Sequence, residues 1–154
     1  MIELFDETGR LSDAELGHIE DVLNGYLSRF DPDAARTGGP RFALFLITDE
    51  AIRGLNREHR ELDEPTDVLS YPLNEPDDVG FPELPFLGDV FISLDTAATQ
   101  AETAGHGLLD EVLLLAAHGH THLRGYDHQT EEEWQTFEAA QSRVLDLARA
   151  NRSA

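Results

Sequence analysis

Three histidines in one short stretch have the spacing that binding of a single metal ion requires. His118 and His122 are four residues apart, so on a helix they lie on one face with about 5–6 Å between their Cβ atoms. Gly125 is expected to end that helix, because glycine readily adopts the left-handed conformation that follows many helices. The chain can then turn back and bring His128 to the same ion. Three imidazole ligands leave the fourth position of a tetrahedral zinc open for water, which is typical of catalytic zinc sites.

Two neighbours of these histidines narrow the choice of function. The same histidine and glycine spacing occurs in the metzincin proteases, in which a glutamate after the first histidine is the general base. Gly119 stands at that position here, so the metal ligands are kept while a metalloprotease becomes a less favoured alternative. His120 lies about 200° round the helix from His118 and cannot share the ion. We expect His120 to face solvent or to form a hydrogen bond in the core.

The composition is that of an acidic chain of domain size. The 154 residues are 40% hydrophobic, which suits a globular domain with its own core. There is no run of roughly 18 apolar residues that could span a membrane. The chain has no cysteine, and its first residues lack a basic and apolar leader, so we expect a cytoplasmic protein.

The net charge of −20 bears on the choice of substrate. A chain this acidic repels nucleic acid at long range, which argues against broad electrostatic wrapping of RNA. All its basic residues are arginines, whose planar guanidinium groups can bind two phosphate oxygens at once. Arg53, Arg57 and Arg60 follow one another at i, i+4 and i+7. They form either a basic stripe or a solvated face with ion pairs such as Asp49–Arg53.

Hydrophobic periodicity, caps and breakers predict one α+β domain with about four short strands in a mixed sheet and about five helices. The expected strands are 1–6, 42–47, 68–72 and part of 86–93. The helices are expected to begin at Ser12 or Asp13, at Thr48 or Asp49, at Asp95, at Leu108 and at Thr130, and to end near residues 30, 59, 105, 124 and 150. We expect the apolar run 42–47 to be covered on both faces. The loop 74–85 is expected to border the active site.

The segment that carries the first two histidines is apolar on nearly every side. Its apolar residues are Leu108, Leu109, Val112, Leu113, Leu114, Leu115, Ala116 and Ala117. A helix of this kind is buried at the centre of a fold, and a site on a buried helix is held rigidly. We therefore predict one central buried helix that carries the metal ligands. Trp134 and Phe137, in the last helix, are expected to be packing residues.

With these motifs in place, the chain resembles the YbeY family of ribosomal RNA maturation factors. The matching residues are His118-Gly119, His122-Leu123, Gly125 to His128, Leu55-Asn56, Arg60, Pro65 to Pro72, Leu87 to Asp89 and Gly105-His106. The resemblance implies a zincin-like fold, a single metal-dependent hydrolase domain over residues 1–154 and one zinc ion per chain. It also implies a single-strand-specific endoribonuclease that matures the 3′ end of small-subunit ribosomal RNA and acts in ribosome quality control. The implied partners are ribosomal RNA, the small ribosomal subunit and assembly proteins, with no DNA.

The resemblance and the chemistry together assign roles to the metal ligands and to one arginine. His118, His122 and His128 would hold zinc, which would lower the pKa of its bound water toward ~7. Arg60 is the predicted catalytic residue, because its guanidinium could neutralise charge that develops on the phosphoryl oxygens. Alternatively, Arg60 forms an ion pair with Asp63 or Glu64.

Further residues are candidates for binding substrate or for supporting the ligands. Arg57, Ser70 and His106 are the substrate-binding candidates, although His106 could instead only end a helix. Asp127 either orients a histidine as a carboxylate behind the ligands or caps the turn. The main alternative function is a non-catalytic ribosome assembly factor that keeps its zinc for folding.

Overall fold

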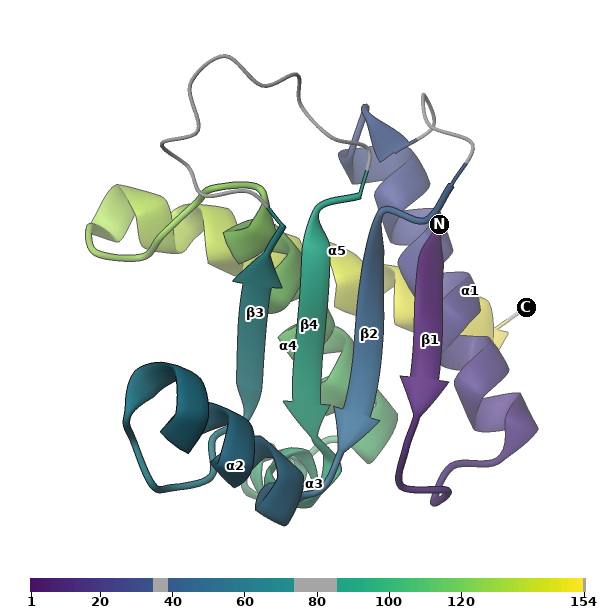
Figure 1. Cartoon of the computed structure of the whole chain (residues 1–154). Coiled ribbons are helices and arrows are strands. Elements are labelled where there is room, and N and C mark those ends of the chain that lie inside the picture. Colours follow the sequence, from purple (N-terminus) through teal and green to yellow (C-terminus); the bar gives the residue numbers. More distant parts are fainter. Residues whose placement is uncertain (35–38, 74–85, 154) are drawn as a thin grey trace.

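The structure is a computed structural model that describes residues 1–34, 39–73 and 86–153 (Figure 1). These residues form a four-stranded mixed sheet and five helices, which confirms the predicted α+β class. In chain order the elements are β1 (Ile2–Asp6), α1 (Asp13–Phe30), β2 (Phe42–Ile47), α2 (Asp49–Arg60), β3 (Val68–Pro72), β4 (Gly88–Ser93), α3 (Leu94–Ala104), α4 (Leu108–Leu123) and α5 (Glu131–Ser153). The prediction for the loop 74–85 concerns residues outside the described part.

The helices begin where side chains cap them. Ser12 and Glu15 form a capping box at the start of α1, in which each side chain bonds the backbone N–H of the other residue. Thr48, not Asp49, caps α2. Ser93 caps α3, so this helix begins one residue before the predicted Asp95. At the other end of the chain, α5 continues to Ser153, past the predicted end near 150.

The sheet has the strand order β1-β2-β4-β3. β1, β2 and β4 run parallel, and β3 runs antiparallel to β4 at the edge of the sheet. β3 ends at Pro72, opposite Gly88, as an edge strand permits. Gly88 has a φ of 144°, and a Cβ on it would collide with the carbonyl oxygen of Tyr71. Glycine therefore lets β4 begin directly against the end of β3, the strand that borders the site described below.

Helices α1 and α4 pack on one face of the sheet, and α5 lies on the same side, packed against α1 and α4 (Figure 1). In the core on this face, side chains of β2 and β4 pack against side chains of α4. Its members include Leu44, Leu46, Val90, Ile92, Val112, Leu113 and Ala116. α4 contacts α1, α3 and α5 as well as β3 and β4. The predicted central buried helix is confirmed.

The opposite face of the sheet is covered only in part, by α2. Ile52 of α2 forms a second buried cluster with Ile47 and Leu69, and Phe45 packs against it. Farther from α2, on the edge strand β1, Phe5 is 43% exposed. The prediction that β2 is covered on both faces is therefore only partly right, because α2 does not extend over the whole face and Phe45 stays half-buried.

A buried polar cluster connects the end of α1 with α4. Asp31 accepts hydrogen bonds from Nε of Arg41 and from Nε2 of His120, each at 2.8 Å. Burial alone would raise the pKa of Asp31, but the hydrogen bonds from His120 and Arg41 hold it below its usual range. Burial lowers the pKa of His120 more than its bond to Asp31 raises it. His120 is thus a neutral, core-bonded histidine, one of the two predicted alternatives.

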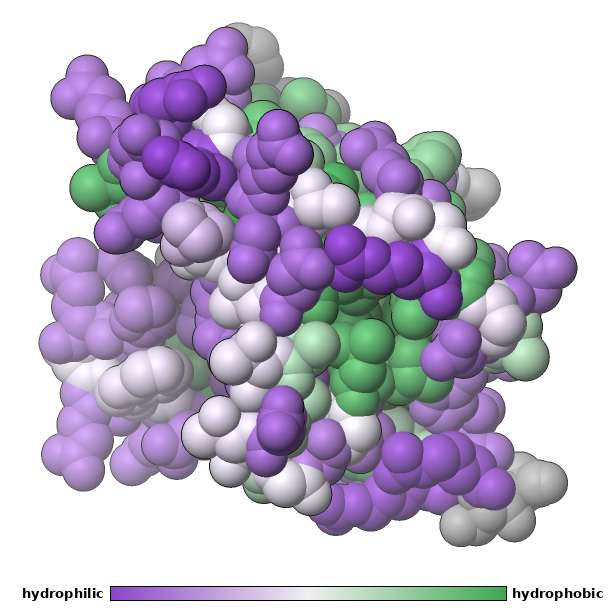
Figure 2. Space-filling view, turned by 90° about the horizontal axis from the view of Figure 1, so that it is seen from below, coloured by the Kyte–Doolittle hydropathy of each residue, from purple (hydrophilic) through white to green (hydrophobic). Residues whose placement is uncertain are grey.

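Two further observations concern the hydrophobicity of the helices and of one end of the surface. Within the described ranges, no helix is both long and apolar enough to cross a membrane. The end of the molecule that carries α2 and α3 is largely hydrophilic, with hydrophobic residues gathered in one area near its middle (Figure 2).

Candidate metal centre

The last turns of α4 bring two of the three histidines together. His118 and His122 lie on one face of this helix, and their Nε2 atoms are 3.1 Å apart. His128 completes the group, with ligating nitrogens of all three side chains within 4.8 Å of one another. The opposite side of α4 is packed in the core, so the two helical histidines are held by a rigid element. This cluster could hold one metal ion.

The turn after α4 explains how His128 returns to the helix. Gly125 has a φ of 97°, and its N–H donates to the carbonyl oxygen of His122, as predicted for a glycine after a helix end. Asp127 then accepts the backbone N–H of His128 at 2.8 Å and Nε2–H of Gln129 at 3.0 Å. Both carboxylate oxygens therefore accept hydrogen bonds within the turn.

The hydrogen bond of His122 fixes which nitrogen can bind a metal. Its Nδ1 lies 3.1 Å from the carbonyl oxygen of Tyr126, and a carbonyl can only accept, so Nδ1 carries the proton. Nε2, on the side of His118, is then left with its lone pair. A backbone carbonyl behind a ligand is a common support for a metal-bound histidine.

Electrostatics keep the helical histidines neutral. Burial, followed by the proximity of His122 and His128, lowers the pKa of His118 to about 4. Burial also lowers the pKa of His122, against the opposing effect of its bond to Tyr126. Histidine binds metals as the neutral imidazole, so at neutral pH these side chains need not lose a proton before they bind an ion.

Two aromatic residues of α5 complete the walls of the centre. Phe137 is fully buried, and its ring centroid lies 4.7 Å from those of His118 and His122 and 5.2 Å from that of His128. Trp134 stacks on His128, with centroids 4.9 Å apart and planes at 19°. Both were predicted as packing residues, but their contact with the histidines was missed. Their i, i+3 spacing puts both on one face of the helix that directly follows His128, and this spacing was the signal that could have predicted the contact.

The histidines open onto a pocket of about 630 Å³. It is lined by His59, Arg60, Thr66, Asp67, Val68, Leu69, Ser70, Tyr71, Pro72, His118, His122, Asp127 and His128. Arg60, at the end of α2, forms no ion pair with any described residue. Asp67, which is not among the site residues predicted from the sequence, lies close enough to His118 to raise its pKa. The pocket thus combines the three clustered histidines and His59 with one arginine, Arg60, and two carboxylates, Asp67 and Asp127.

The other predicted site residues are divided between the pocket and more distant positions. Ser70 lines the pocket, and its hydroxyl donates to the carbonyl oxygen of Gly119 at 3.4 Å. Arg57 is not among the lining residues; its guanidinium lies 3.7 Å from Asp63. His106 precedes the start of α4, at the opposite end of that helix from the histidine cluster, and bonds Glu111 at 2.7 Å.

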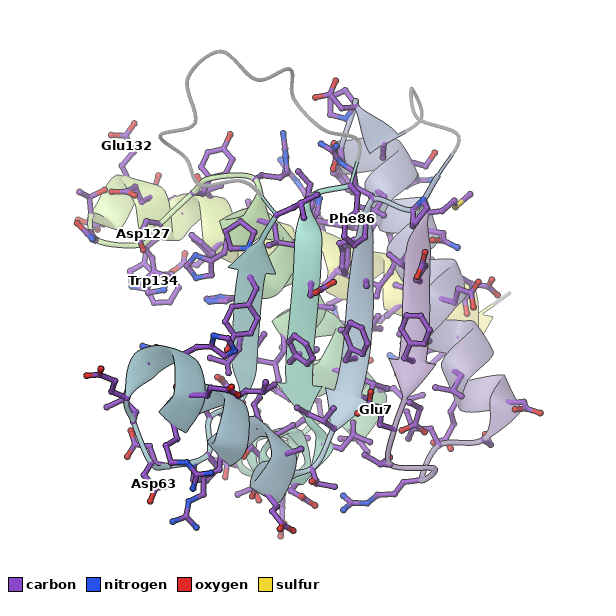
Figure 3. All side chains as sticks on the ribbon, in the orientation of Figure 1. Glu7, Asp63, Phe86, Asp127, Glu132 and Trp134 are labelled. Carbon is purple, nitrogen blue, oxygen red and sulfur yellow. The ribbon has the colours of Figure 1, made fainter. Side chains whose placement is uncertain are left out.

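The arginines of α2 do not form a continuous stripe on the pocket. Arg53 donates from Nε and from a terminal nitrogen to Asp63, at 2.8 and 3.1 Å, so its partner is Asp63 and not the expected Asp49. Asp63 lies below α2, away from Asp127 and Trp134 at the centre (Figure 3). Only Arg60 of the three lines the pocket.

The fold and the site together define a class: an α+β protein with a three-histidine centre, able to hold a metal ion, beside an open pocket. The family model described as Endoribonuclease YbeY matches residues 7–149. The Endoribonuclease YbeY of Thermus thermophilus is 51% identical over 110 residues, which cover 71% of this chain and 78% of that protein. The Endoribonuclease YbeY of Bacillus licheniformis is 35% identical over 158 residues, which cover 99% of this chain and 98% of that protein.

The chain therefore belongs to the Endoribonuclease YbeY family. The solution structure of TM1509 from Thermotoga maritima has the same fold, with a TM-score of 0.63 at 24% identity over 98% of this chain and 93% of that one. The resemblance drawn from the sequence is confirmed.

Proposed function

We propose that the chain is a zinc-dependent endoribonuclease that cuts single-stranded RNA. The observation that carries the proposal is the set of three histidine nitrogens within 4.8 Å of one another, on the wall of a pocket that also contains Arg60. The relatives named above are endoribonucleases by their names. A phosphodiester in this pocket would lie beside both a metal and a guanidinium, the two groups that best stabilise charge on phosphoryl oxygens.

The donor set fits zinc. Three neutral imidazoles suit zinc, and they leave one position of a tetrahedral site for water. Zinc bound there would supply hydroxide near neutral pH by lowering the pKa of its water. We assign His118, His122 and His128 as the ligands of one zinc ion per chain.

The chain's own residues would bind and orient the RNA. Arg60 has no competing ion pair among the described residues, so its guanidinium is available to a phosphate, and we assign it the catalytic role. Ser70 also lines the pocket and can contact the substrate backbone. Arg57 and His106 lie outside the pocket lining, so they would act on substrate only where it extends beyond the pocket.

The biological role follows from the family resemblance. We propose 3′-end maturation of small-subunit ribosomal RNA and ribosome quality control in the cytoplasm, by one domain over residues 1–154, with no DNA substrate. The net charge of −20 weakens long-range attraction to RNA. Contacts with the small ribosomal subunit and its assembly proteins would therefore supply much of the affinity.

The decisive experiment is cleavage of a labelled single-stranded RNA by zinc-loaded protein, with His122→Ala purified in the same way and zinc measured in both. Cleavage that requires His122 and bound zinc is the expected result, with duplex RNA of the same sequence left uncut. Equal cleavage by both preparations would indicate a contaminating nuclease. An inert wild-type protein that still binds one zinc per chain would favour the non-catalytic assembly factor.

A further inference from the structure

His128 differs from the other two histidines in how it is held. His118 and His122 project from a buried helix, whereas His128 lies between α4 and α5, in a segment without regular structure. Its backbone N–H is bonded by Asp127, but its imidazole forms no hydrogen bond with any described residue. Its direct ring contacts are with the other two histidines, Trp134 and Phe137.

Trp134 is the one among these contacts that lies flat against His128. The two ring planes differ by 19°, and the centroids are 4.9 Å apart. The indole is itself oriented by the buried Phe137, which meets it edge-on at 6.1 Å. The first turn of α5 is fixed by Thr130, whose carbonyl accepts the N–H of Trp134 at 3.0 Å. A rigid helix start therefore presents the indole to a histidine that lies on a loop.

We propose that Trp134 is a positioning residue that holds the imidazole of His128 in its metal-binding orientation. The inference deepens the proposed function, because it rests on the three histidines being the metal ligands. Trp134 is 44% exposed, so its large ring contributes less to the core than its size would allow. Burial in the core therefore does not account for a ring of this size at position 134, whereas its stacking on His128 does. Residues that orient a ligand typically change metal affinity about 10–100-fold when they are removed.

The test compares zinc affinities, measured by competition with a chromophoric chelator. Trp134→Ala is expected to bind zinc about 10–100-fold more weakly than wild type, and Trp134→Phe, which keeps a stacking ring, is expected to recover most of the affinity. Phe5→Ala is the matched control. Phe5 is 43% exposed and stacks on Phe45 at 5.0 Å and 18°, on the edge strand β1. Its loss should leave zinc binding unchanged.

A second readout does not depend on a variant of Trp134. The chain contains one tryptophan, so fluorescence excited selectively at tryptophan reports on the indole that stacks on His128. Zinc should change the emission of the wild-type protein, since it places a positive charge on the imidazole beside the indole. His128→Ala should show no such change. If Trp134→Ala does not fold, the change in tryptophan emission on zinc binding, and its absence in His128→Ala, serve as the test of the positioning role.

The outcomes separate this inference from the proposed function. Trp134→Ala that binds zinc as tightly as wild type, or an emission that zinc leaves unchanged although zinc is bound, would overturn the positioning role alone. A wild-type protein that binds no zinc would overturn the metal centre and this inference with it. Loss of affinity in Phe5→Ala to the same degree would also count against a specific role for Trp134.

Discussion

Gly119 packs directly against Val90 of β4: a Cβ built on Gly119 would lie 2.7 Å from Cγ1 of Val90 and 3.1 Å from Oγ of Ser70. Cores are packed too densely to accept an added atom at such a distance without movement. A side chain at 119 would thus meet the sheet. A glutamate, the residue that metzincins have at this position, would have no room here. The structure therefore adds a steric reason to the chemical one against a metalloprotease.

Gly119→Ala should destabilise the protein by about 1–3 kcal/mol because of this overpacking, although alanine is by itself the better helix residue. Gly54→Ala in α2 is the matched control, because a Cβ there meets nothing within 4 Å; it should be neutral or stabilise by up to about 1 kcal/mol. Urea unfolding measures both. Adding Val90→Ala to Gly119→Ala should recover part of the loss. Equal effects of the two glycine substitutions would contradict the packing argument.

Arg60→Ala should lower kcat/KM for RNA cleavage on the order of 100-fold, because a cation next to the developing phosphoryl charge is removed. Arg53→Ala, whose guanidinium is engaged with Asp63 outside the pocket lining, should have little effect. Steady-state cleavage of a labelled RNA measures both variants with zinc content held equal. Similar losses in the two variants would instead support a continuous basic stripe along α2.

Asp31→Asn should destabilise the fold by about 3–5 kcal/mol, because it removes the carboxylate that pairs with buried Arg41 and accepts from His120. Asp146→Asn provides the comparison, since Asp146 is 77% exposed and lies 3.7 Å from Arg149; surface pairs of this kind contribute little. Denaturant midpoints and slopes measure the two variants. If both shift the midpoint equally, the buried cluster has no special role in stability.

The metal-free protein should become more stable as the pH rises from about 4 to 6.5. In this window the unfolded chain binds a proton at His118, while the folded chain, in which the pKa of His118 is lowered from 6.5 to about 4, does not. Unfolding therefore takes up protons, and the free energy of unfolding increases with pH. His118→Gln should reduce this uptake by up to about one proton near pH 5.5. Denaturant unfolding of chelator-treated wild type and His118→Gln across this pH range measures the effect. If the free energy of unfolding rises with pH equally steeply in both proteins, the prediction is wrong.

Local signals in the sequence were sufficient to predict that the three histidines come together. The i, i+4 spacing of His118 and His122 and the glycine at 125 depend only on helix geometry and on backbone conformation near the site. The same holds for the helix starts at Ser12 and Thr48, because a cap bonds N–H groups within three residues. These features were predicted, and the structure contains them.

Tertiary structure alone decided what surrounds the three histidines. Asp31 and His120 are 89 residues apart, and they meet only because α1 and α4 lie on the same face of the sheet. Trp134 and Phe137 read as core residues from their spacing, but the direction in which α5 leaves the turn sets them against the histidines. Arg53 has acidic neighbours on both sides in sequence, and the fold selects Asp63. Hydrophobic periodicity records which face of an element is buried, not which element covers it. The sequence therefore determined the cluster of three histidines, whereas the strand order β1-β2-β4-β3 and the packing of α5 decided the aromatic side chains around it and its pocket.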